Sequence, residues 1–167
     1  MEKEYKGTPG VTKLVTKETP LQILSEDYPL HQWPISGGWG YTKDDAVVIE
    51  LDNSNDGVAF EYKFMQYRSF EEGIVFMPKG QRLAGFNFET KMQCLLSGKD
   101  GRHYDRIVME VTVFREEDFD FLKNDWESHN GYEDDLEGKM EHLLLAESKR
   151  IRYEIEGYFD ITRFFGK

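Results

Sequence analysis

The chain has 167 residues, a length typical of one domain, and its aromatic content of 14% excludes an intrinsically disordered protein. Its 21 basic and 32 acidic residues give a net charge of −11, which excludes the broad basic surface that nucleic acids and anionic membranes require. The uninterrupted apolar runs are too short for a membrane-spanning helix, and the first ten residues lack the apolar stretch of a secretory signal. With Cys94 as the single cysteine, no intrachain disulfide is possible, so we expect a cytoplasmic protein.

The first part of the chain predicts short elements around an ordered loop. Residues 1–10 are polar and contain glycine, so we expect a flexible N-terminus followed by one domain over residues 11–167. Val11 to Glu18 has the composition of a strand. Thr19 and Pro20 are typical of a helix start, because Thr caps the helix and Pro suits its first position. Residues 30–41 hold two Trp, one Pro and three Gly, which predicts an ordered loop instead of a linker.

The middle of the chain predicts strands. Residues 46–51 are rich in Val and Ile, and residues 52–57 form a polar cluster typical of a turn. Val58, Phe60, Tyr62 and Phe64 alternate with other residues at period two, so residues 58–65 are expected to pair with 46–51 as a hairpin. A short strand over 74–77 is a further expectation. The clearest pair is 86–96 with 106–114, joined by a loop at 97–102.

Two helices and then one or two strands are expected after residue 115. Phe119, Leu122 and Trp126 have helical spacing and predict one buried stripe. A second helix is expected over residues 133–148, with one apolar face formed by Leu136, Met140, Leu143 and Leu144. Residues 151–155 and 158–165 then return to a strand pattern. The order predicts an α+β fold with a mostly antiparallel, curved sheet and these two helices packed on it, and a closed barrel is the alternative.

Acidic residues are concentrated in one segment. Residues 116–137 contain ten acids against the single base Lys123. Such a segment is either a solvated helical face or a surface that attracts a basic partner. We favour a non-enzymatic binding protein that neutralises a basic partner as bacterial immunity proteins do, a comparison that rests on composition alone. The expected partner-binding residues are Glu116, Glu117, Asp118, Asp120, Trp126, Tyr132, Glu133, Asp134 and Asp135, with the two aromatic residues as anchors.

The alternative hypothesis is a small-molecule-binding protein or enzyme whose pocket lies between the sheet and the loop around residues 30–45. Glycines in that loop allow a close approach of the backbone to a ligand, and its aromatic residues are suited to lining a pocket. No dinucleotide-binding or Walker motif is present. The residues expected to line this pocket are His31, Trp33, Trp39, Tyr41, Asp44, Asp45 and His103.

Other kinds of chemistry have little support in the sequence. His103 and Asp105 share one side of a strand, but neither a third metal ligand nor a catalytic motif accompanies them. Cys94 alternates with Met92 and Leu96, which predicts a buried thiol and not a nucleophile. We therefore expect no cofactor and no metal. Self-association through a sheet edge, with residues 158–165 as the contact, is a third hypothesis.

Overall fold

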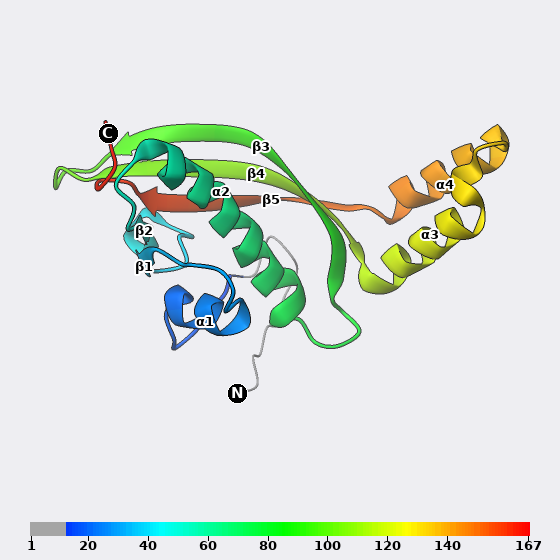
Figure 1. Ribbon diagram of the computed structural model, residues 1–167, viewed down its shortest axis with the longest axis horizontal. Coiled ribbons are helices and arrows are strands. Elements are labelled where there is room, and N and C mark those ends of the chain that lie inside the picture. The colour runs from blue at the N-terminus through cyan, green and yellow to red at the C-terminus, as the bar shows by residue number, and fades with distance from the viewer. Residues whose placement is uncertain (1–12) are drawn as a thin grey trace.

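The computed structural model describes residues 13–167 and has the element order of an α+β fold (Figure 1). Its main helices and strands are α1 (Pro20–Asp27), β1 (Ile35–Gly37), β2 (Val47–Ile49), α2 (Ser54–Phe70), β3 (Leu83–Ser97), β4 (His103–Arg115), α3 (Glu116–Ser128), α4 (Leu136–Lys149) and β5 (Ile151–Asp160). The start of α1 at Pro20, the β3–β4 hairpin and the two C-terminal helices were all expected from the sequence.

Five strands form one sheet in the order β1-β2-β5-β4-β3. β2 and β5 pair in parallel, and the other neighbours pair antiparallel. The register of β3 against β4 shifts between Ala84 and Asn87 and again between Thr90 and Met92. Such irregularities bend a strand, and the long β3–β4 hairpin is visibly curved in Figure 1. The mostly antiparallel, curved sheet is thus confirmed; over the described residues it stays open, with β1 and β3 as its edges, and does not close into a barrel.

Helix α2 covers the inner face of the sheet, so the prediction of a strand over residues 58–65 was wrong. Asn53 caps the helix by accepting a hydrogen bond from the Asp56 backbone N–H at 2.9 Å. The side chains that α2 buries recur at helical spacing: Phe60, Glu61, Phe64, Met65 and Arg68. Glu71–Val75 continues α2 as a π-helical turn, so the expected strand at 74–77 is also absent from these residues.

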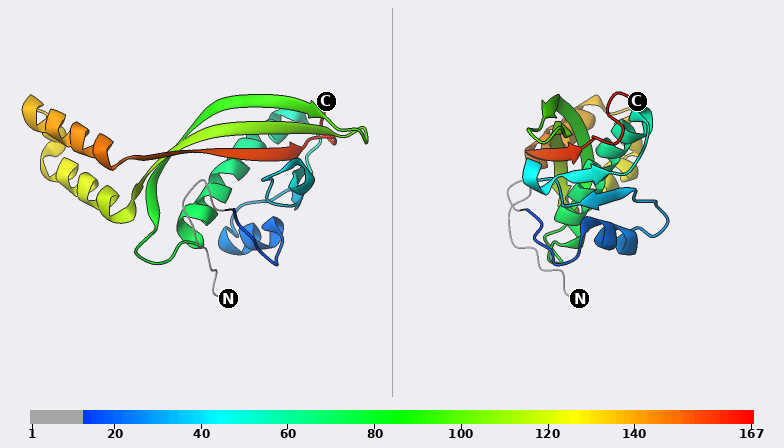
Figure 2. Two further views of the ribbon diagram at one scale, coloured as in Figure 1. Left: turned by 180° about the vertical axis from the view of Figure 1, so that it is seen from behind. Right: turned by 90° about the vertical axis from the view of Figure 1, so that its left-hand side faces the viewer.

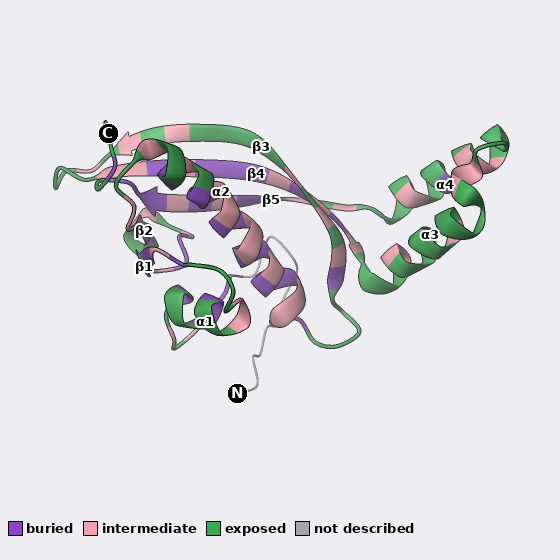
Figure 3. Cartoon of the chain, in the orientation of Figure 1, coloured by how far each residue is buried: buried purple, intermediate pink, exposed green. Residues whose placement is uncertain are grey.

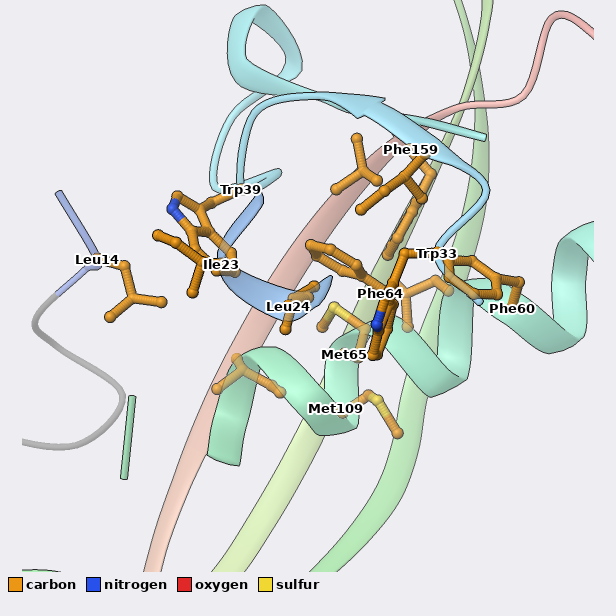
Figure 4. Close-up of a cluster of buried hydrophobic side chains, with 14 of the residues drawn as sticks. Leu14, Ile23, Leu24, Trp33, Trp39, Phe60, Phe64, Met65, Met109 and Phe159 are labelled. Carbon is orange, nitrogen blue, oxygen red and sulfur yellow. The ribbon is translucent and has the colours of Figure 1, made fainter. Parts of the chain in front are cut away.

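The core lies between α2, the sheet and the loop that follows α1. Figure 4 shows Trp33 and Phe60 close together, with Phe64 of α2 directed toward Phe159 of β5. The rings of Phe64 and Phe159 meet edge to face at 5.8 Å, and both side chains are fully buried. The two loop tryptophans belong to this core: the ring of Trp33 lies 5.9 Å from that of Phe60, and the ring of Trp39 lies 6.2 Å from that of Phe64.

Part of the N-terminal prediction is corrected and part lies outside the structure. Residues 13–18 do not form a strand. Residues 11–12, and the N-terminus expected to be flexible at 1–10, lie outside the described residues. Within residues 13–167, no helix has both the length and the apolar character needed to cross a membrane.

The two C-terminal helices are placed differently from the expectation. They were expected to pack on the sheet, but they project beyond its end as a helical hairpin (Figures 1 and 2). The first turns of α3 contact the β3–β4 hairpin, where Phe119 lies against Gly85 and Phe114. The rest of α3 and all of α4 extend away from the sheet. The helix that covers the sheet is α2, as described above.

A close approach of α2 to β5 gives a testable prediction. Gly157 faces α2, and a Cβ at this position would overlap Met65 Sδ. Gly157→Val is expected to lower the free energy of unfolding by about 1–3 kcal/mol, because the helix must move away from the sheet. Urea unfolding followed by circular dichroism measures this loss. Glu154→Ala on the exposed side of the same strand is the control, and equal stability of the two variants would contradict the packing described.

Candidate interaction surface

The projecting helical hairpin, residues 116–149, is the most distinctive surface of the molecule and is called the arm below (Figure 1). It holds twelve Asp and Glu residues and only three Lys residues. The arm thus carries nine of the eleven net negative charges of the chain. Because the arm lies beyond the end of the sheet, both of its helices present negative charge to solvent.

Local sequence signals explain why this segment forms a helical hairpin. Glu116, Glu117 and Asp118 occupy the first turn of α3, where negative charge favours the helix dipole. Gly131 has a φ of 68°, a left-handed conformation that glycine adopts without strain, and it turns the chain between the helices. Asp135 then caps α4 by accepting a hydrogen bond from the Gly138 backbone N–H at 2.9 Å.

A polar cluster fastens the two helices to each other. Asp125 of α3 contacts His142 of α4, with 2.6 Å between Asp125 Oδ2 and His142 Nδ1. The Tyr132 hydroxyl, in the turn, donates to the same Asp125 oxygen at 2.8 Å. These hydrogen bonds from His142 and Tyr132 lower the pKa of Asp125, and burial together with Asp125 raises the pKa of Tyr132 to about 12. The ring of Trp126 lies 5.1 Å from that of His142 and completes the cluster.

Apart from this junction, the arm is open to solvent. Between residues 116 and 149, all of which the structure describes, Leu122 and His142 are the only buried residues, and Figure 3 shows the arm almost free of buried positions. The apolar face expected on the second helix is present but has no cover from the sheet. Its exposed fractions are 75% for Leu136, 52% for Met140, 48% for Leu143 and 68% for Leu144.

The residues expected to bind a partner all lie on the arm, but they differ in availability. Six of the acids are exposed: Glu116, Glu117, Asp120, Glu133, Asp134 and Asp135. Three of the expected residues are engaged within the arm. Asp118 Oδ1 lies 4.0 Å from Lys149 Nζ, the Asp135 side chain caps α4, and the Tyr132 hydroxyl donates a hydrogen bond to Asp125. Trp126 is 36% exposed, so part of this residue is open to solvent beside the turn. The four-residue apolar face of α4 was recognised from the sequence, but it was not included among the residues expected to bind a partner.

The structure does not gather the residues of the alternative pocket hypothesis around one ligand site. Trp33 and Trp39 are buried in the core, at 7% and 4% exposure. His31 Nε2 lies 2.9 Å from the Tyr67 hydroxyl, and the ring of His103 stacks on Phe165 with 3.7 Å between ring centroids. Asp44 and Asp45 belong to the 3-10 helix Lys43–Asp45 before β2.

Tyr41, another residue of that set, lines a cavity between α2 and the sheet. The cavity measures about 310 Å³ and lies at the edge of β5, where its walls include Tyr41, Arg68, Glu72, Arg106 and Glu156. Four of its charged residues form two pairs: Arg68 Nε lies 3.2 Å from Glu72 Oε1, and Arg106 is bonded to Glu156. These two pairs neutralise the charges of Arg68, Glu72, Arg106 and Glu156 within the cavity wall.

Metal and cysteine chemistry gain no support from the geometry. Within residues 13–167, no group of three or more His, Cys, Asp or Glu side chains is arranged to hold a metal ion. Cys94 is half-buried on β3, so the expectation of a buried thiol is corrected: the residue lies on the outer face of the sheet, which α2 does not cover.

Comparison of the chain with protein-family models, with curated proteins and with solved structures found no match.

The Asp125 cluster gives a prediction about the arm that is independent of any partner. Asp125→Ala is expected to speed amide hydrogen exchange in α3 and α4, because it removes the shared acceptor of His142 and Tyr132. Since the folded state lowers the pKa of Asp125, this contribution is present above the ordinary Asp pKa and is lost as the pH falls through the lowered value. Exchange followed by mass spectrometry measures the effect, with Asp134→Ala at an exposed position of the same arm as the control. Equal protection in both variants would show that the cluster does not fasten the hairpin.

Proposed function

We propose that this protein is a non-enzymatic binding protein whose arm engages a basic protein partner in the cytoplasm. The observation that carries the proposal is the concentration of nine of eleven net negative charges on a hairpin that projects from the sheet. A projecting charged element reaches a partner without obstruction by the rest of the molecule.

Charge and apolar surface have separate roles in this proposal. The exposed acids raise the rate of encounter with a basic surface and suppress acidic competitors. Affinity then depends on apolar contacts, and the arm offers Trp126 beside the turn and the open face of α4. Acids alone would give a weak, salt-sensitive contact, so the presence of both features on one element supports a binding surface over a merely solvated helix.

The test is capture of partners from a lysate of the source cells by matched variants of the full chain. The arm variant carries Asp120→Lys, Glu127→Lys and Asp134→Lys, and the control carries the same charge change on the body of the protein, Glu26→Lys, Glu89→Lys and Glu154→Lys; all six positions are exposed. We expect the wild type and the body variant to retain the same basic protein, and the arm variant to associate with it about tenfold more slowly at low salt. Equal retention and equal association rates for the two variants would contradict the proposal.

A further inference from the structure

We propose that the partner is received as a basic amphipathic helix that lies along α4 and covers Leu136, Met140, Leu143 and Leu144. These four residues are called the α4 stripe below. This inference rests on the proposed function, because it specifies the form and the contact of the basic partner. It adds a binding mode in which the arm and the incoming helix form a three-helix assembly.

The geometry of the α4 stripe suits a helix. Its members are spaced at i, i+4, i+7 and i+8, and at 3.6 residues per turn they lie within an arc of about 100°. His142, which faces α3, lies on the opposite side of α4. The stripe therefore points away from the hairpin junction, and α4 itself offers about 21 Å of length. Apolar residues at this spacing are the contacts by which an amphipathic helix is held.

The charges around the α4 stripe decide which occupant fits. Glu137 and Glu141 are exposed and border the stripe on one side, and Glu133 and Asp134 are exposed just before its N-terminal end. Lys139 borders the other side, where its Nζ lies 5.9 Å from the centre of the Trp126 ring, so acids outnumber bases around the stripe. A second copy of this chain would bring the same acids to the contact and would be repelled. A helix with Lys or Arg beside its own apolar stripe pairs with these acids while covering the leucines.

The amount of open apolar surface argues for a dedicated contact. Single exposed leucines are ordinary on protein surfaces, but a contiguous apolar patch on one helix marks an interaction site. Three of the four stripe residues are at least half exposed, and all four lie within nine positions of the chain. In Figure 1 the sheet and α2 lie beyond the other end of the arm and do not cover α4.

The test measures binding of two labelled peptides of about eighteen residues to the full chain by fluorescence anisotropy. The first peptide is a basic amphipathic helix with leucines on one face and lysines beside them. The second has the same composition in an order that disperses the leucines around the helix. We expect the first peptide to bind at least about tenfold more tightly than the second, a difference of about 1.4 kcal/mol, and to become helical on binding by circular dichroism.

Matched variants locate the contact. Met140→Ser with Leu144→Ser removes the centre and one end of the α4 stripe, and Val15→Ser with Leu30→Ser is the control at two exposed apolar positions outside the arm. All four positions are exposed, so both variants are expected to fold. The stripe variant is expected to weaken binding of the first peptide about tenfold, and the control to leave it within about twofold.

Three results would overturn the inference. In the first, the two peptides bind equally, and only the arm charge variant weakens that binding. The proposed function would then stand, but the partner would not bind as a helix along α4. Sedimentation that shows a dimer of the free protein, lost in the stripe variant, would assign the α4 stripe to a second copy of this chain. Peptide binding that neither the stripe variant nor the arm charge variant changes would remove both the inference and the proposed function.

Discussion

The free energy of unfolding is expected to fall by several kcal/mol as the pH rises from about 5 to about 9, because Glu61 is protonated in the folded protein. Glu61 is fully buried in α2 and faces Asp105 of β4. Burial, and then the neighbouring Asp105 carboxyl, raise the pKa of Glu61 to about 9. The folded state thus binds one more proton than the unfolded chain between the ordinary Glu pKa and this value. The stabilising contribution of Glu61 is fully present below the ordinary Glu pKa and is lost as the pH rises to about 9.

The surroundings of Glu61 favour this assignment. Gln93 of β3 donates a hydrogen bond to Asp105, and the Tyr62 hydroxyl donates to Gln93 Oε1 at 2.6 Å. Asp105 is therefore held as an acceptor by Gln93, and a protonated Glu61 can donate to it. Two ionised carboxylates at this buried contact would repel each other.

Chemical unfolding between pH 5 and pH 9 measures the effect. Glu61→Gln keeps the donor but cannot ionise, so its stability is expected to change far less over this range. Glu89→Gln, at an exposed position on β3, is the control and should follow the wild type. A wild-type protein whose stability does not decline toward pH 9, or a Glu61→Gln variant that declines equally, would contradict the assignment.

Replacement of Arg68 by Met is expected to cost about 3–5 kcal/mol of unfolding free energy. Arg68 is 1% exposed and joins three parts of the fold. Its guanidinium donates to the Trp39 carbonyl at 3.0 Å and to the Glu156 carbonyl at 2.6 Å, and its Nε lies 3.2 Å from Glu72 Oε1. Burial raises the pKa of Glu72, and Arg68 opposes that rise, so removal of Arg68 leaves a buried carboxyl without its cation.

A double variant separates the charge from the packing. Arg68→Met with Glu72→Leu is expected to regain part of the loss, because it also removes the buried carboxyl that Arg68→Met alone leaves without its cation. Arg163→Met is the control: this side chain is half exposed and pairs with Glu50 and Asp52 at the surface, so the unfolding midpoint should hardly move. A single Arg68→Met variant as stable as the control would show that Arg68 does not hold the loop, α2 and β5 together.

The strands with a strong local pattern were predictable. Residues 86–96 and 106–114 alternate over many positions with a turn cluster between them, and the structure pairs them as β3 and β4. The start of α1 followed from Thr19 and Pro20, and the capping box there is present. In each case the local sequence pattern agrees with the structure that these residues adopt in the folded protein.

Helix α2 was missed because its sequence alternates by coincidence over residues 58–65. Phe60 and Phe64 are buried, but Val58 and Tyr62, which complete the apparent period of two, are only partly buried. The helical period is instead completed by Glu61 and Arg68, which are polar. A pattern that counts only apolar residues leaves out the buried carboxyl of Glu61 and the buried guanidinium of Arg68. The helical period was therefore not recognised from the sequence.

The arm shows a different limit of sequence reasoning. The periodicity of Leu136, Met140, Leu143 and Leu144 correctly predicted an apolar helical face, but an apolar face does not state what covers it. The same pattern is found on a helix that packs against its own sheet and on a helix whose apolar face binds another protein. The placement of α3 and α4 beyond the sheet decides between them, and it depends on the lengths of β3, β4 and β5, which carry the hairpin outward (Figure 1).

The most direct test of the arm as the binding surface is amide hydrogen exchange of the full chain, alone and in complex with the protein that it captures. We expect slower exchange in residues 116–149 on binding, greatest over α4, with the rest of the described chain unchanged. Slower exchange confined to the sheet, α1 or α2, with the arm unchanged, would contradict the account.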